Sequence, residues 1–148
     1  MTSNSFFERE LRKALQLELA SRRIEAIGSS TPYFARLEKC YPAKGSRIDW
    51  SKVNRAVGQI EPNAELQQAA FTAFFDVTVE QFSLSGTVLY LGDSATDSAF
   101  AAELTAMRQV LPKLLEIPQH HYFVAQSCEW CIFFSMEGDM AFGFGHIQ

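Results

Sequence analysis

The sequence predicts an α+β fold: a mainly antiparallel sheet with a C-terminal three-stranded meander, packed by several helices. Apolar, aromatic and β-branched runs at 122–125, 130–136 and 140–144 are separated by short polar turns, and short turns make neighbouring strands antiparallel. Side chains alternate along a strand, so Trp130 and Cys131 point to opposite faces, and the residues that follow keep both faces apolar. A sheet of this kind needs cover on both sides.

Length and composition predict one domain spanning residues 1–148, because the chain has 148 residues and 47% hydrophobic content. No apolar run reaches the ~18 residues that a membrane-spanning helix needs, and residues 1–10 lack the apolar stretch of a signal peptide. Three cysteines cannot all pair internally, which is typical of a reducing compartment. We therefore expect a cytoplasmic protein with no membrane contact.

The N-terminal segment has the pattern of a long helix. Ser5 is a candidate N-cap, and Glu8 stands at the spacing of a capping box. Apolar residues at helical spacing extend this helix to about Ile27, with two stripes that suggest a bend. Gly28 and Pro32 end it, since glycine favours a helix C-terminus and proline cannot continue the hydrogen-bond ladder.

Two further helices are predicted before residue 61. Residues 33–40 form a short helix with its aromatic side chains inward, and residues 41–46 form a loop. Apolar residues at helical spacing over 50–60 predict another helix, which Asp49 is placed to cap.

A core helix begins at Pro62 or Asn63. Its apolar face is rich in phenylalanine, with Phe71, Phe74 and Phe75 close together. Such density also occurs in ligand pockets, but aromatic stripes at helical spacing are usually core because these side chains bury large areas. We therefore expect no bound ligand or cofactor here.

Residues 87–91 read as a short strand, and hydroxyls and acids at 94–97 offer caps for the next helix. That helix should run through 100–115, with a kink or restart at Pro112. The order strand, helix, meander favours an antiparallel α+β arrangement over repeated βαβ units.

Charge is uneven along the chain, although the net charge is only −4. Residues 1–50 have a balance of +3, whereas residues 51–148 hold four Lys and Arg against eleven Asp and Glu, a balance of −7. A negative field over the sheet-bearing part disfavours nucleic acid as a partner and favours a basic protein.

The pair Cys128 and Cys131 has Cys-x-x-Cys spacing, and two of the histidines at 120, 121 and 146 would complete a set of four zinc ligands. We predict no metal site, because Cys131 lies inside a strand and Cys128 in the preceding turn, so their side chains point in different directions. A thioredoxin-like role needs a helix after the pair, and a strand follows.

Two adjacent histidines, His120 and His121, suggest a general base, and Asp93 follows a strand as in metal-dependent hydrolases. Neighbours in a strand face opposite sides, so only one histidine can enter a given site. No nucleophile elbow, phosphate loop or dinucleotide fingerprint accompanies them. A small metal-dependent hydrolase is thus an alternative, and we assign no catalytic residue.

The C-terminal part resembles a known family. The segments that carry the resemblance are Leu89-Tyr90-Leu91-Gly92-Asp93-Ser94, Pro118-Gln119-His120-His121-Tyr122-Phe123, Glu129-Trp130-Cys131 and Met136-Glu137-Gly138-Asp139-Met140-Ala141-Phe142-Gly143. Together they resemble small bacterial immunity proteins of contact-dependent growth inhibition and related polymorphic toxin systems. The resemblance implies a non-enzymatic protein that binds the cognate toxin C-terminal domain, often a nuclease, and so protects the producing cell.

The predicted negative field agrees with a basic toxin as partner. No motif transfers individual contact residues, so the candidate toxin-binding residues are acids expected at turns, where side chains reach outward: Asp93, Asp97, Glu129, Glu137 and Asp139. An adaptor module with another protein partner is a further alternative.

Overall fold

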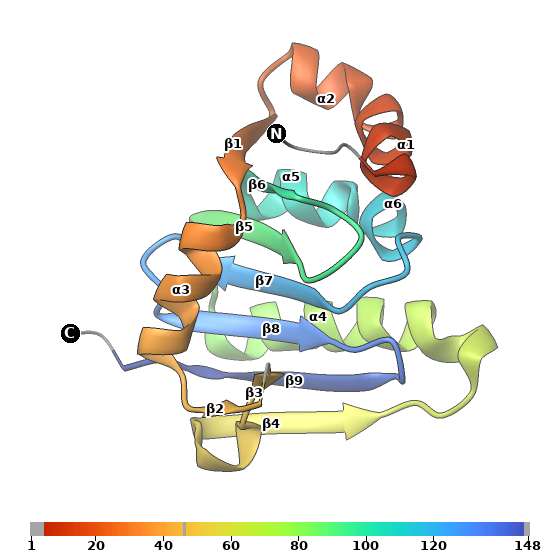
Figure 1. Ribbon diagram of the computed structural model, residues 1–148. Helices are drawn as coiled ribbons and strands as arrows, with labels where there is room; N and C mark the ends of the chain where they lie inside the picture. The colour runs from red at the N-terminus through yellow and green to blue at the C-terminus, as the bar shows by residue number, and fades with distance from the viewer. Residues whose placement is uncertain (1–4, 46, 147–148) are drawn as a thin grey trace.

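The protein contains a seven-stranded sheet in the order β1-β6-β5-β7-β8-β9-β4, in which every neighbouring pair is antiparallel. The computed structural model describes residues 5–45 and 47–146. Helices pack on both faces of the sheet, which confirms the α+β prediction (Figure 1). Residues 1–4, part of the stretch expected to lack a signal peptide, and Ser46, the last residue of the predicted loop, lie outside the described residues.

The strands of this sheet are β1 (Ile24–Ser29), β4 (Asn54–Ile60), β5 (Thr87–Gly92), β6 (Ser98–Glu103), β7 (His121–Ala125), β8 (Trp130–Phe134) and β9 (Asp139–Phe144). A separate hairpin pairs β2 (Ala43–Lys44), which lies within the segment predicted as a loop, with β3 (Arg47–Ile48), which follows that segment. The predicted meander is confirmed as β7, β8 and β9. β8 ends two residues early, because the Ser135 hydroxyl accepts hydrogen bonds from the turn amides of Glu137 and Asp139.

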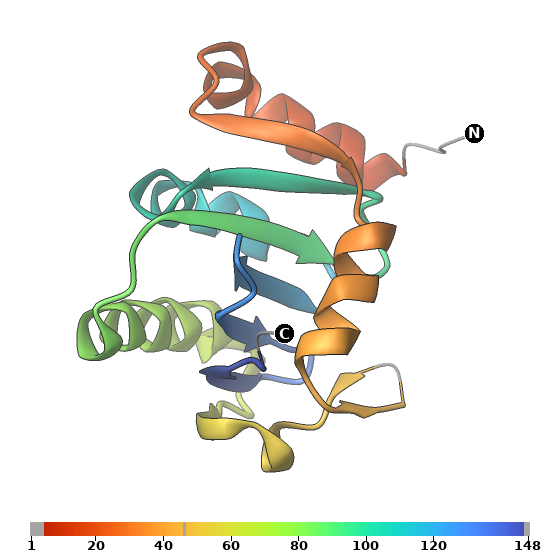
Figure 2. The ribbon, with the colours of Figure 1, turned by 90° about the vertical axis from the view of Figure 1, so that its left-hand side faces the viewer.

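The helices are α1 (Phe6–Ala14), α2 (Gln16–Ala20), α3 (Thr31–Cys40), α4 (Gln67–Phe82), α5 (Leu104–Gln109) and α6 (Leu111–Leu115), with the short 3₁₀ turns η1 (Trp50–Lys52) and η2 (Ala64–Leu66). α3 covers one face of the sheet, whereas α1, α4, α5 and α6 cover the other (Figure 2). No helix in the described ranges is long and apolar enough to cross a membrane.

Both faces of β8 are buried, as its alternation predicts. Trp130, Ile132 and Phe134 pack with the helices α1, α4, α5 and α6, and the rings of Phe71 and Phe134 stack with centroids 4.5 Å apart. Cys131 and Phe133 face the second core, which α3 covers. The aromatic residues of α4 are therefore core residues.

The predicted helix from Ser5 to Ile27 is wrong beyond α2. Ser5 caps α1 as predicted, accepting a hydrogen bond from the Glu8 amide, but Arg22 adopts a positive φ of 63° that ends the helical path. Residues 24–29 then form the edge strand β1, in which Ile24 pairs with Ala102. Hydrogen bonding to β6 therefore makes this segment a strand, although Ile24 and Ile27 have helical spacing.

The helix predicted for residues 50–60 is also wrong. Asp49 caps only η1, where its carboxylate accepts from the Ser51 amide, and the chain then becomes β4 beside β9. Spacing that places Val53 and Val57 on one helical face is compatible with an extended chain, and Val57 pairs with Phe142 of β9. Pairing with β9 therefore selects the extended conformation of this segment over a helix.

The long helix predicted over 100–115 is divided. Residues 98–103 form β6 between β1 and β5, which provide hydrogen-bond partners on both sides. Helical structure begins only at Leu104, and α6 restarts at Leu111 with Pro112 in its first turn, as the proline predicts. Ser94 and Thr96 therefore lie in a strand-to-strand loop and do not cap a helix.

Candidate functional site

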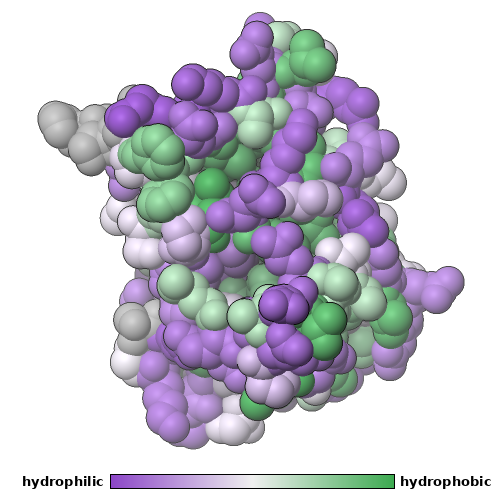
Figure 3. All heavy atoms as spheres, turned by 90° about the vertical axis from the view of Figure 1, so that its right-hand side faces the viewer, coloured by the Kyte–Doolittle hydropathy of each residue, from purple (hydrophilic) through white to green (hydrophobic). Residues whose placement is uncertain are grey.

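Four of the five predicted acidic residues lie at one end of the sheet, and one of them is Asp97, which precedes β6. Asp93 follows β5, Asp139 begins β9, and Glu137 occupies the turn between β8 and β9. β7 starts beside Asp93, because Gly92 pairs with His121. We call Asp93, Glu137 and Asp139 the acidic sheet end. Figure 3 shows this side of the molecule, where hydrophilic side chains are interspersed with hydrophobic ones.

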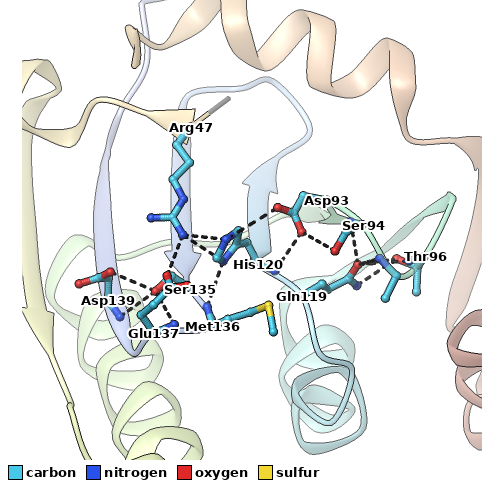
Figure 4. A network of polar contacts seen from close by, with 11 residues as sticks. Arg47, Asp93, Ser94, Thr96, Gln119, His120, Ser135, Met136, Glu137 and Asp139 are labelled. Atoms are coloured by element: carbon cyan, nitrogen blue, oxygen red, sulfur yellow. Dashed lines mark hydrogen bonds and ion pairs between the residues drawn. The ribbon is translucent and has the colours of Figure 1, made fainter. Parts of the chain in front are cut away.

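Arg47 of β3 joins the acidic sheet end from the hairpin (Figure 4). Its Nη2 lies 2.7 Å from Glu137 Oε1. The hydrogen bond from Arg47 lowers the pKa of Glu137, and the same bond raises the pKa of Arg47. Sequence reasoning missed Arg47, since ninety positions separate it from Glu137 and no element was predicted for residues 47 and 48.

His120 connects Asp93 with the turn that carries Glu137. Its amide donates to Asp93 Oδ1 at 3.0 Å, and its Nδ1 accepts from the Met136 amide at 3.0 Å. Nε2 lies 2.7 Å from Arg47 Nη2 and 4.0 Å from Asp93 Oδ2. Arg47 Nη2 is thus within hydrogen-bond distance of the ring, whereas the Asp93 carboxylate lies beyond hydrogen-bond distance of Nε2.

Ser135 fixes the position of Asp139. Its hydroxyl donates to Asp139 Oδ2 at 3.2 Å and accepts from the Asp139 amide at 2.9 Å. Ser135 is buried, so the bond is shielded from water. The Asp139 carboxylate is therefore held close to the turn, whereas Asp93 and Glu137 are exposed.

Gln119 holds the loop that carries Asp93. Its Oε1 accepts from the amides of Ala95 at 2.8 Å and Thr96 at 3.1 Å, and its Nε2 donates to the Tyr90 hydroxyl at 2.9 Å. Gln119 is almost completely buried. The polar loop residues that the sequence suggested as helix caps therefore lie in a loop that Gln119 holds by hydrogen bonds.

His121 lies on the other face of β7 from His120, as strand alternation predicts. Its Nδ1 accepts from the Tyr90 hydroxyl at 2.7 Å, and its ring stacks on Phe134. Burial lowers the pKa of His121 to about 3, so the ring is uncharged at neutral pH. Of the two histidines, His120 is the one that the fold places beside Asp93.

Asp97 lies in the β5–β6 loop at the same end of the sheet as Asp93, whereas Glu129 lies at the other end. The Asp97 amide donates to the buried Glu8 carboxylate, and its carbonyl accepts from the Ser30 amide, which ties this residue to the loop ahead of α3. Glu129 lies at the opposite end of β8, where its carbonyl accepts from the Gly145 amide. The five predicted acids therefore do not form one surface.

The three cysteines are free and buried. Cys128 and Cys131 belong to the same core as Cys40, so the prediction that their side chains diverge is wrong. Burial raises the pKa of Cys128 to about 12 and raises that of Cys131 strongly. Within residues 5–45 and 47–146, no group of three or more His, Cys, Asp or Glu is placed to hold a metal ion.

The acidic sheet end is thus a surface of fixed carboxylates with one arginine, suited to contact a cationic protein surface. A scan of the chain against protein-family models gives no match, and neither does a search of curated proteins.

Proposed function

We propose that this protein is an immunity protein, which binds and neutralises a basic toxin domain of a contact-dependent growth inhibition system. The observation that carries the proposal is the convergence of Asp93, Glu137 and Asp139 at one end of the sheet. These residues belong to the segments by which the sequence resembles such proteins.

The carboxylates are held in place before any partner arrives. Asp93 accepts from the His120 amide and Glu137 from Arg47, so little conformational entropy is lost when a partner binds. An exposed apolar side chain, Met136, lies next to Glu137. Apolar side chains among fixed charges are typical of protein-binding surfaces.

Charge favours a basic partner. Arg47 offsets one of the three acids, so the acidic sheet end keeps a net negative charge, and residues 51–148 as a whole have a balance of −7. Complementary fields accelerate encounter and select among partners. A cationic active site, as in enzymes that bind nucleic acid, presents such a surface.

The test is rescue followed by direct binding. The toxin domain encoded beside this gene is expressed in susceptible cells with and without this protein, and the purified pair is titrated by calorimetry. We expect restored growth, one-to-one binding and an affinity that falls as salt rises. Absence of both rescue and binding would contradict the proposal.

Isosteric variants locate the surface. Asp93→Asn and Glu137→Gln remove charge at the acidic sheet end, whereas Glu129→Gln makes the same change at the opposite end of β8. A desolvated acidic anchor contributes about 2–5 kcal/mol to a tight complex, whereas a rim acid contributes far less. We expect the first two variants to weaken binding and Glu129→Gln to leave it unchanged; an equal loss in all three would place the toxin elsewhere.

A further inference from the structure

The outer strand β4 leaves one edge of the sheet open. It is the last strand in the order, and among the described residues it pairs only with β9 (Figure 1). The Glu61 amide donates to the Gly138 carbonyl, which continues the ladder beyond the end of β4. Backbone groups alternate along an antiparallel strand, so Gly58 and Ile60 direct their N–H and C=O groups away from β9. Such an edge is a template for another strand.

Apolar surface accompanies this open edge. Ile60 is 65% exposed and Val57 is 39% exposed, although both lie in a regular part of the strand. Beside them is a groove of about 660 Å³, walled by Trp50 and Phe133. Ala56, Gly58 and Ala141 also line the groove, and their small side chains leave space between the larger ones.

Charge differs between the two ends of β4. Arg55 lies at its start, with its guanidinium 4.1 Å above the Phe144 ring, and the exposed Lys52 precedes it. Glu61 follows its end, and the exposed Glu65 lies further on. A strand that is positive at one end and negative at the other is complementary to itself when two copies run antiparallel.

We propose that β4 binds a second copy of this chain, with the two strands antiparallel across a two-fold axis at Gly58. In this register Gly58 pairs with its counterpart and Ile60 lies opposite Ala56 of the other copy. Arg55, at the bulge between Asn54 and Val57, then lies beside Glu61 of the other copy. Each exposed Ile60 then lies at the rim of the other copy's groove. Gly58 suits the centre, because a glycine allows two backbones to approach closely.

The acidic sheet end borders this contact, because Asp139 pairs with Ile60 and lines the groove together with Arg47. Asp93 and Glu137 do not line the groove, so a dimer built through β4 leaves both of them accessible in each copy. The inference is argued from β4 and its groove and does not rest on the proposed function. A pair of edge strands forms a small interface, for which a dissociation constant of about 10–100 μM is reasonable.

The oligomeric state of the full chain tests the proposal. In sedimentation equilibrium, the mass should rise from 16.7 kDa toward twice that value as the protein concentration passes through the micromolar range. Ile60→Lys places a charge at the apolar contact, so it should raise the dissociation constant by about tenfold or more. Val77→Lys, at a 59% exposed position on α4, is the matched control and should leave the dimer unchanged.

Charge exchange provides a sharper test. Arg55→Glu and Glu61→Arg should each weaken self-association by about tenfold or more, since like charges then face each other across the axis. A mixture of the two variants should form heterodimers, because every facing pair is again of opposite charge. A monomer at all concentrations, or a dimer that neither Ile60→Lys nor the charge variants weaken, would overturn the proposal.

Discussion

The side-chain amide of Gln119 occupies the space that a Cβ atom on Gly92 would need. Gly92 is the last residue of β5, and Gln119 precedes β7, so this contact joins the two strands where Asp93 leaves the sheet. The amide cannot move aside easily, because it bonds the backbone of the 93–97 loop and the Tyr90 hydroxyl.

Gly92→Ala should therefore destabilise the protein. The added methyl group would displace the Gln119 amide and break its buried hydrogen bonds, at a cost of about 1–3 kcal/mol. Urea denaturation followed by circular dichroism measures the loss. In a Gln119→Ala background the same change should cost much less, and an equal cost in both backgrounds would contradict the contact as its cause.

His121 should make stability depend on pH in the mildly acidic range. Its folded-state pKa of about 3 lies below the ordinary value near 6.5, so the unfolded chain takes up the proton first as pH falls. Stability contributed by this group is complete above about pH 6.5 and declines toward pH 3, by up to about 1.4 kcal/mol per pH unit.

The test compares the free energy of unfolding at several pH values for the wild type and His121→Gln. The glutamine variant should show a smaller decline between about pH 6 and pH 5, where few carboxyl groups titrate. His146→Gln changes an exposed histidine and should retain the wild-type slope. Identical slopes for wild type and His121→Gln would refute the assignment.

Glu8 is a buried carboxylate that ties α1 to the start of β6. Burial opposes its ionisation, but hydrogen bonds from the Ser98 amide and hydroxyl, the Asp97 amide and Arg12 lower its pKa below the usual value. The stability that it contributes is present above the unfolded-state pKa and is lost as pH falls through the lower folded-state pKa.

Glu8→Gln should cost about 3 kcal/mol at pH 7, since the glutamine amide presents a donor to groups that are donors themselves. The deficit should shrink in acid, where the wild-type carboxyl is protonated too. Chemical denaturation at pH 7 and at acidic pH measures the free energy of unfolding of the wild type and of Glu8→Gln. Glu10→Gln, at an exposed residue whose ion pair with Lys13 spans 3.4 Å, should change stability by less than about 0.5 kcal/mol.

Arg47→Ala should raise the pKa of Glu137 toward its ordinary value, because the Arg47 hydrogen bond is the main cause of the lowered pKa. NMR titration of the Glu137 side-chain carboxyl carbon follows the change directly. Arg36→Ala removes an arginine that donates to the Gln126 carbonyl at the other end of the sheet, so it should leave Glu137 unchanged. A Glu137 pKa unaffected by Arg47→Ala would contradict the ion pair.

Phe71 should be among the residues most sensitive to truncation. Its ring is fully buried and stacks on Phe134 with an interplanar angle of 6°. Phe71→Ala should lower the free energy of unfolding by about 3–5 kcal/mol through lost burial and a cavity. Val77→Ala, on an exposed part of the same helix, should change it by less than about 0.5 kcal/mol, as measured by thermal or urea denaturation.

Part of the candidate site follows from local sequence. Asp93, Glu137 and Asp139 stand next to strands that the sequence predicts, and adjacent antiparallel strands bring their ends together. Arg47 and Gln119 were not foreseen as members, because their roles depend on contacts with residues distant in the chain, such as Glu137 and Thr96. Nothing local to either residue indicates such a partner.

The sequence by itself determined the α+β class, the meander and the faces of β8, because short aromatic and β-branched runs separated by short polar turns favour adjacent antiparallel strands. Only the tertiary structure decided that β1, β4 and β6 are strands. These segments are rich in alanine, glycine and isolated aliphatic residues whose spacing fits either a helix or a strand. Their backbone hydrogen bonds come from neighbours far away in sequence, and those neighbours supply the free energy that selects the extended form.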